Sequence, residues 1–245
     1  MRDLSAARIL KGLVGTRFRH VEVHSSIDST QTRLVTEGGR DGRVIVADHQ
    51  TAGRGRAGRS WLDVPGAMLM FSALLRGVEA ERASLVALAG GVAVARAVAG
   101  HAEVEPRLKW PNDVLIGGRK VCGMLGELAP SGDYVVLGIG VNVGHEPGQL
   151  PDDLGATSIR IASGSVSRRD DLCVSILREL DALVDADDLI DAYKPLCETL
   201  GRHVRVELGE GTIEGRATDV RADGALIVGG TAVVAGDVVH LREGG

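Results

Sequence analysis

The sequence predicts an α+β fold with a small all-β domain at its C-terminal end. Two observations lead to this prediction. Apolar patterns with helical and strand periods interleave as far as residue 200. From residue 201 onward the helical pattern stops, and short Val-rich strands alternate with Gly-rich turns. We therefore expect a large domain over residues 1–200 and a small SH3-like β-barrel over residues 201–245.

Composition narrows the class of protein. With 245 residues and a formal net charge of −5, the chain can form one large domain with an appendage, and it lacks the basic balance of a general nucleic-acid binder. Its three cysteines have no metal-ligand spacing and indicate free thiols in a reducing compartment. The longest apolar run, residues 85–95, is too short to span a bilayer, and the N-terminus lacks the apolar block of a signal peptide. We expect a soluble cytoplasmic protein without nucleic-acid or membrane partners.

The elements of the large domain follow from hydrophobic periodicity. It predicts helices over residues 4–13, 31–37, 82–98, 169–185 and 189–200, and strands over residues 18–24, 44–47, 68–75, 114–116, 119–128 and 134–143. The helix over residues 82–98 is apolar on nearly all sides, so it should lie against the sheet, and its glycine pair Gly90 and Gly91 allows a close approach.

A capping segment precedes the second helix. Asp28, Ser29 and Thr30 provide an N-cap, and the helix N-terminus behind such a cap can receive a carboxylate or another polar ligand. The alternative interpretation is a cap with no further role.

The most unusual stretch is the Gly/Arg loop, which we define as residues 51–61. It alternates three glycines with three arginines and ends in a tryptophan: Gly53, Arg54, Gly55, Arg56, Gly58, Arg59 and Trp61. Glycine lets backbone amides approach phosphate oxygens, and arginine binds phosphate or carboxylate with a planar fork. The glycines match the dinucleotide-binding spacing, but no helix opens within the motif and another strand follows it. We therefore expect an anion-binding loop, with a solvated surface turn as the alternative.

Two later segments also place charged and polar side chains where an anionic ligand could bind. Residues 109–113, Lys-Trp-Pro-Asn-Asp, place a cation, an indole, a rigid turn and a carboxylate side by side. On the second strand of the hairpin that turns at Gly117-Gly118, strand alternation places Lys120 on the face of Cys122 and Met124. A solvated lysine is the alternative for this position. Further on, Gly138 and Gly140 remove side chains from one face of an apolar strand, which leaves room for a ligand.

Taken together and in order, these motifs resemble the biotin protein ligases. The resemblance rests on Asp28-Ser29-Thr30, on residues 50–61 from Gln50 to Trp61, on Lys109 to Asp113, on Arg119 to Gly123 and on Gly138 to Asn142, and it covers nearly the whole chain. It implies a mixed-sheet catalytic domain of the biotin/lipoate ligase type. It also implies that biotin and ATP, with Mg²⁺, form biotinyl-5′-AMP, from which biotin passes to a lysine of a biotin carboxyl carrier domain of a biotin-dependent carboxylase.

The resemblance also assigns site residues. Cations should neutralise the approach of a carboxylate to the α-phosphate, and the family's positions for this work fall on Arg54, Arg56 and Lys120. The positions implied for biotin are Ser29, Thr30, Gln31, Gln50, Gly53, Arg54, Gly55, Arg56, Lys120, Gly123, Gly138 and Gly140. Those implied for ATP and the adenylate are Arg54, Arg56, Arg59, Trp61, Lys109, Asn112, Asp113, Lys120 and Asn142, with Trp61 covering the adenine once the loop closes. No magnesium ligand is assigned.

The chain departs from the family pattern in two ways. Gln31 stands where the family usually has Asn. Members that also repress transcription carry a winged-helix domain ahead of the catalytic domain, whereas 28 residues precede Ser29, so we expect no operator binding. Two alternatives for the function are a lipoate protein ligase, whose Arg-Arg-x-x-Gly-Gly-Gly pattern is absent, and a biotin or nucleotide sensor without turnover.

Overall fold

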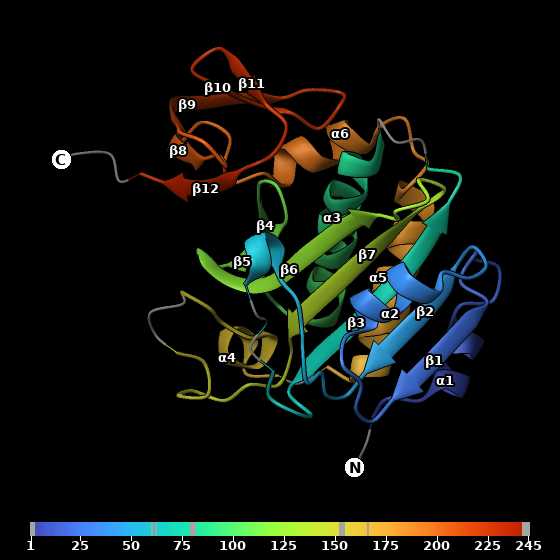
Figure 1. The fold of residues 1–245 in the computed structure, drawn as a ribbon. Helices are drawn as coiled ribbons and strands as arrows, with labels where there is room; N and C mark the ends of the chain where they lie inside the picture. Colours follow the sequence, from blue (N-terminus) through green and yellow to red (C-terminus); the bar gives the residue numbers. More distant parts are fainter. Residues whose placement is uncertain are drawn as a thin grey trace.

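A seven-stranded mixed sheet organises the large domain. The computed structural model describes residues 3–59, 61, 63–78, 82–151, 155–165 and 167–241. The strands of this sheet are β1 (His20–His24), β2 (Arg43–Ala47), β3 (Met68–Arg76), β4 (Pro106–Lys109), β5 (Asp113–Ile116), β6 (Arg119–Leu128) and β7 (Tyr134–Asn142). Their order is β1-β2-β3-β7-β6-β5-β4, and only β1 and β2 pair in parallel. The expected α+β class is confirmed (Figure 1).

The two faces of this sheet have different coverings. The helices are α1 (Ala6–Gly12), α2 (Thr30–Glu37), α3 (Ala83–His101), α4 (Ile159–Ser163), α5 (Arg169–Leu183) and α6 (Leu189–Tyr193). Helices α3 and α5 cover one face and enclose the main core, whereas α2 lies on the other face (Figure 1). Strand alternation sorts the side chains accordingly: Leu137 and Ile139 of β7 belong to the main core, and Val136 belongs to a second cluster with Leu34 of α2.

Helix α3 is a core helix. By length and composition it could cross a membrane, with a mean hydropathy of 1.7, but 67% of its apolar window is buried inside the protein. The glycine pair predicted to allow close approach does so. A Cβ added at Gly90 would lie 2.9 Å from Cδ2 of Leu137 and 3.0 Å from Sδ of Met124. Bulkier residues would therefore push α3 away from the sheet.

A second sheet occupies the C-terminal part of the chain. Its strands are β8 (His203–Glu207), β9 (Thr212–Val220), β10 (Leu226–Val228), β11 (Thr231–Val233) and β12 (Asp237–His240), all paired antiparallel in the order β11-β10-β9-β8-β12. The small strand-rich fold is as expected, although the described strands form an open ladder with β11 and β12 at its edges. The domain boundary at residue 200 stays a prediction.

Besides shifts of a few residues at element ends, β4, α4 and α6 differ from the periodicity analysis. Strand β4 and the short helix α4 were not predicted. With 4 and 5 residues, they are too short to show a clear hydrophobic period. The helix expected over residues 189–200 ends at Tyr193, and a 3₁₀ turn with Pro195 continues from Lys194 to Leu196. Proline has no amide hydrogen to extend the α-helical ladder, which accounts for the earlier end.

An uncharged histidine, His240, lies at the junction between the two sheets. The hydroxyl of Thr199 accepts a hydrogen bond from the backbone N–H of Trp110 (3.1 Å) and lies 3.1 Å from Nε2 of His240. Burial, with Lys109 and Arg202 nearby, lowers the pKa of His240 to about 4. The lowered pKa indicates a neutral ring near pH 7.

We predict that this junction weakens in acid. As pH falls from about 6.5 to about 4, the unfolded chain takes up the His240 proton before the folded chain does, so stability that is complete above about pH 6.5 declines across that window. Urea unfolding near pH 7 and near pH 5 measures the decline, and His240→Gln should show a smaller one than the wild type. Equal declines in the two proteins would contradict the prediction.

Candidate active site

One cavity gathers almost all of the predicted site residues. It has a volume of about 670 Å³ and lies between the α2 side of the seven-stranded sheet, the Gly/Arg loop and strand β12. Of the residues assigned from the sequence, only Gly53 is not part of its wall, and the carbonyl of Gly53 instead accepts the backbone N–H of Trp61 (3.1 Å). The lining residues from the prediction are Ser29, Thr30, Gln31, Gln50, Arg54, Gly55, Arg56, Arg59, Trp61, Lys109, Asn112, Asp113, Lys120, Gly123, Gly138, Gly140 and Asn142.

Glycines make the floor of the cavity. Gly123 of β6 stands directly opposite Gly140 of β7 in the strand register. The Trp61 indole lies on both: an added Cβ would fall 2.8 Å from Cζ3 at Gly123 and 2.7 Å from Cε2 at Gly140. Trp61 Nε1 is buried and has no acceptor among the described residues. The ring thus lies on the glycine floor, and a polar ligand could accept a hydrogen bond from its unpaired Nε1–H.

The N-terminus of α2 supplies a polar wall. Ser29 caps the helix by accepting the N–H of Thr32 (3.3 Å), as the sequence predicts. The next residue, Thr30, donates its backbone N–H to Oε1 of Gln50 (2.8 Å), and its hydroxyl lies 2.9 Å from that of Ser72. This chain of contacts aligns three polar side chains along one side of the cavity.

Gln31, the departure from the family pattern, has a defined place. Its amide nitrogen donates to the carbonyl of Val136 (3.1 Å), and its Oε1 accepts the hydroxyl of Ser72 (3.1 Å). A Cβ added at Gly138 would lie 2.6 Å from this Oε1. Gln31 is buried and therefore fills the space that Gly138 leaves open.

The predicted orientation of Lys120 is wrong. The pairing of β5 with β6 shifts register, since Val114 pairs with Cys122 whereas Leu115 pairs with Lys120, which leaves Val121 as an extra residue. This bulge turns Lys120 to the cavity side, where its Nζ lies 3.0 Å from the Cβ position of Gly123, away from the buried face of Cys122. Strand alternation alone predicted the opposite face because it assumes an unbroken ladder.

Lys120 has two partners in the cavity. Its ammonium is 2.6 Å from Oδ1 of Asp113 and lies 5.4 Å from the centroid of the Trp61 ring. One third of the side chain is exposed, so the cation remains accessible. An arriving anion could therefore pair with Lys120 in competition with Asp113.

The loop arginines are held by three different parts of the chain. Arg54 makes a bidentate pair with Glu127 (2.9 and 3.2 Å), and Arg59 pairs with Asp237 (2.8 Å). Arg56 begins a short 3₁₀ turn, Arg56–Gly58, and donates to Oδ1 of Asn112 (2.9 Å). Ser60, which the motif includes, lies outside the described residues.

The cavity carries an excess of positive charge. Five cationic side chains line it, and three carboxylates pair with them, those of Asp113, Glu127 and Asp237. Lys109 takes part in no ion pair between described residues, and the Arg56 guanidinium contacts only neutral oxygens among them. The arrangement suits a polyanionic ligand.

Several lining residues were not predicted from the sequence. Ser72 comes from the strand that follows the loop, and alternation along that strand could have placed it on the cavity side. Asp237 and His240 come from the second sheet, and no local sequence pattern predicts that they line the cavity. Among the described residues no group of three His, Cys, Asp or Glu side chains could hold a metal.

Comparisons with known proteins agree with the geometry. Residues 23–143 match the Biotin/lipoate A/B protein ligase family, and residues 199–241 match the Biotin protein ligase C terminal domain. A biotin–[acetyl-CoA-carboxylase] ligase of Mycobacterium tuberculosis is 38% identical, over 93% of this chain and 91% of that protein. The bifunctional ligase/repressor BirA of Bacillus subtilis is 31% identical, over 92% and 74% respectively.

Solved structures show the same fold. The biotin protein ligase from Aquifex aeolicus, in complex with biotin and ATP, superposes with a TM-score of 0.81 at 29% identity, and the match covers 92% of this chain and 100% of that one. On these similarities of sequence and structure, the chain belongs to the biotin protein ligase family.

Proposed function

We propose that this protein activates biotin with ATP and transfers it to a lysine of a biotin carboxyl carrier domain. The chemistry has two steps. The biotin carboxylate attacks the α-phosphate of ATP, and the P–O bond to pyrophosphate breaks. The carrier lysine then attacks the acyl carbon of biotinyl-5′-AMP, an amide forms, and AMP leaves. We further propose that this takes place in the cytoplasm, with a biotin-dependent carboxylase as the source of the carrier.

The observation that carries the proposal is the convergence of cations over a glycine floor. In the first step a carboxylate approaches a polyanion, and their repulsion must be offset by fixed positive charge in a site with little water. Lys120, Arg54 and Arg56 reach one cavity from a strand and from the loop. In this proposal they exchange their present partners for the carboxylate and the phosphates.

The cavity also has a division suited to the two substrates. Thr30, Gln31 and Gln50 offer amides and hydroxyls beside the glycine floor, which suits the polar ring of biotin. Arg59 pairs with Asp237, Asn112 contacts the Arg56 that also reaches Gly236, and Lys109 lies near His240, so this side borders the second sheet and suits the nucleotide. Trp61 lies against Gly123 and Gly140, on the side proposed for biotin, so its proposed role over the adenine requires the loop to move on binding.

Magnesium would arrive with ATP. Mg²⁺ commonly binds through substrate phosphates, water and one or two carboxylates, and not through a cage of protein ligands. The carboxylates of Asp113 and Asp237 line the cavity and would meet this requirement. When bound, the ion would neutralise phosphate charge.

Labelled biotin, ATP and a purified carrier domain test the function. We expect label on one carrier lysine, dependent on ATP. Transfer of lipoate in place of biotin would identify a lipoate ligase, and binding of biotin without any transfer would identify a sensor. Either result would overturn the proposal.

We predict a large loss of activity for Lys120→Ala. If Lys120 stabilises charge in the adenylation transition state, its removal should cost about 2–4 kcal/mol, or about 30- to 1000-fold in biotin-dependent pyrophosphate exchange. Lys11→Ala on the exposed surface of α1 is the matched control and should exchange normally. Near-normal exchange by Lys120→Ala would return this residue to the solvated-lysine interpretation.

We also predict that ligands order the Gly/Arg loop. Trypsin cleaves after arginine, and Arg54, Arg56 and Arg59 contact other segments through their side chains. Biotin and ATP together should slow cleavage at these sites because the closed loop shields the reactive anhydride from water. Cleavage at one rate with and without both ligands would rule out a closing lid.

A further inference from the structure

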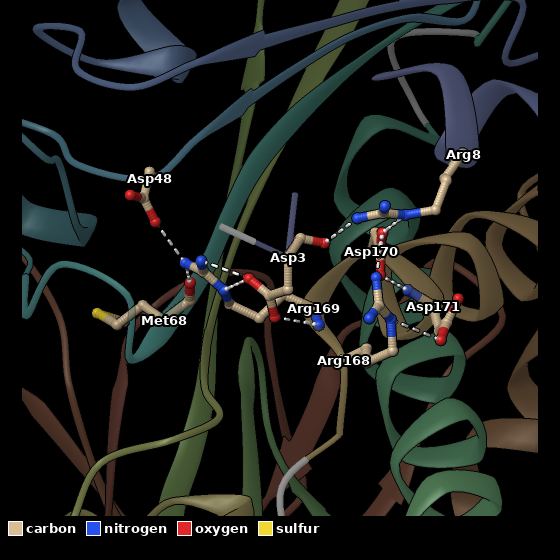
Figure 2. Close-up of polar contacts among 8 residues, drawn as sticks. All are labelled: Asp3, Arg8, Asp48, Met68, Arg168, Arg169, Asp170 and Asp171. Carbon is tan, nitrogen blue, oxygen red and sulfur yellow. Dashed lines mark hydrogen bonds and ion pairs between the residues drawn. The ribbon is translucent and has the colours of Figure 1, made fainter. Parts of the chain in front are cut away.

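A cluster of charged residues lies outside the cavity, at the N-terminus of α5. Figure 2 shows it: three arginines and four aspartates from the N-terminal segment, the end of β2 and the start of α5. It has two halves. Asp170 pairs with Arg8 and Arg168, and the Arg169 guanidinium forms the second half. None of these residues lines the cavity.

Arg169 is buried, and three acceptor groups surround its guanidinium. Only 5% of its side chain is exposed. Its Nη2 lies 2.6 Å from Oδ1 of Asp3, and its Nη1 donates to Oδ1 of Asp48 (2.6 Å) and to the carbonyl of Met68 (3.0 Å). A buried guanidinium is stable only when its donors are matched in this way.

Two of these acceptors are the ends of one connection. Asp48 is the first residue after β2, and Met68 is the first residue of β3. Between them run residues 49–67, which contain the whole Gly/Arg loop. The β2–β3 ladder ends at the pair Ala47 and Met70. Beyond this last pair, Arg169 links Asp48 to Met68, the two ends of the connection, which we call its stems.

The end of the connection that Arg169 holds at Asp48 leads directly to the cavity. Gln50 lies two residues after Asp48 and accepts the backbone N–H of Thr30 in the cavity wall. A loop rich in glycine loses much conformational freedom on closing. Fixed stems reduce the number of arrangements that the open loop can sample, which lowers the entropy lost when it closes over a ligand.

We propose that Arg169 is a positioning residue for the ligase reaction, which fixes the base of the Gly/Arg loop through Asp48 and Met68 without touching a substrate. The kinetic part of this inference rests on the proposed function. Asp3 has a different role: it completes the charge balance of Arg169 and attaches the N-terminal segment to α5, and it makes no hydrogen bond or ion pair with a described residue of the loop.

Asp48→Ala and Asp3→Ala form a matched pair for the test. Each removes one carboxylate from Arg169, and the two aspartate side chains are similarly exposed, at 21% and 25%. Asp48→Ala should speed tryptic cleavage at the loop arginines of the ligand-free protein by about 5- to 30-fold, and Asp3→Ala should leave it near the wild-type rate. Asp48→Ala should also raise KM for biotin and ATP more than it lowers kcat.

Conservative variants separate positioning from folding. Asp48→Asn keeps an oxygen for Nη1 and should restore slow cleavage and a normal KM. Arg169→Lys keeps the charge, but a single ammonium cannot serve all three acceptors, so it should behave as Asp48→Ala does. Equal effects of Asp48→Ala and Asp3→Ala on cleavage and KM, with both proteins folded, would overturn the proposal and leave only a structural ion cluster.

The cleavage comparison needs neither substrate nor turnover. A wild-type protein that transfers no biotin would therefore defeat the proposed function, while the difference between the two aspartate variants would still decide the role of Arg169.

Discussion

The pairing of Gly123 with Gly140 across β6 and β7 is the constraint on which the site depends. Where two glycines face each other on adjacent strands, the sheet presents bare backbone and leaves a hollow. The opposite faces of the same strands carry Met124 and Ile139, which pack in the core beneath α3. One sheet thus provides both a rigid support and a floor shallow enough for a ring to lie on.

Cations reach this floor from elements that are distant in sequence. The loop brings Arg54, Arg56 and Arg59, a bulge turns Lys120 inward, and the second sheet provides Asp237 as a counter-charge. Arg54 contacts β6, whereas Arg56 and Arg59 reach Gly236 and Asp237 at the start of β12, so the loop joins the large domain to the second sheet. Such contacts between exposed groups are individually weak, which suits partners that a ligand must displace.

Local features of the site were predictable from the sequence, and features set by tertiary pairing were not. The Ser29 cap and the close approach at Gly90 follow from residue type and position, and both appear as predicted. The face of Lys120 depends on how β5 aligns with β6, because a single extra residue reverses the alternation. The place of His240 in the cavity wall depends on how the second sheet docks, and no short-range sequence pattern predicts that docking. The family resemblance supplied the assignment of substrates to residues, which composition and spacing could not.

The central claim is that the cavity brings a biotin carboxylate onto the α-phosphate of ATP. Biotin labelled with oxygen-18 in its carboxylate tests this directly, with carrier domain present and the released AMP analysed by mass spectrometry. Because the carboxylate oxygen that attacks phosphorus stays with AMP when the lysine takes the acyl group, we predict one labelled oxygen in AMP and none in pyrophosphate. Unlabelled AMP, with the label in pyrophosphate or orthophosphate, would contradict the account.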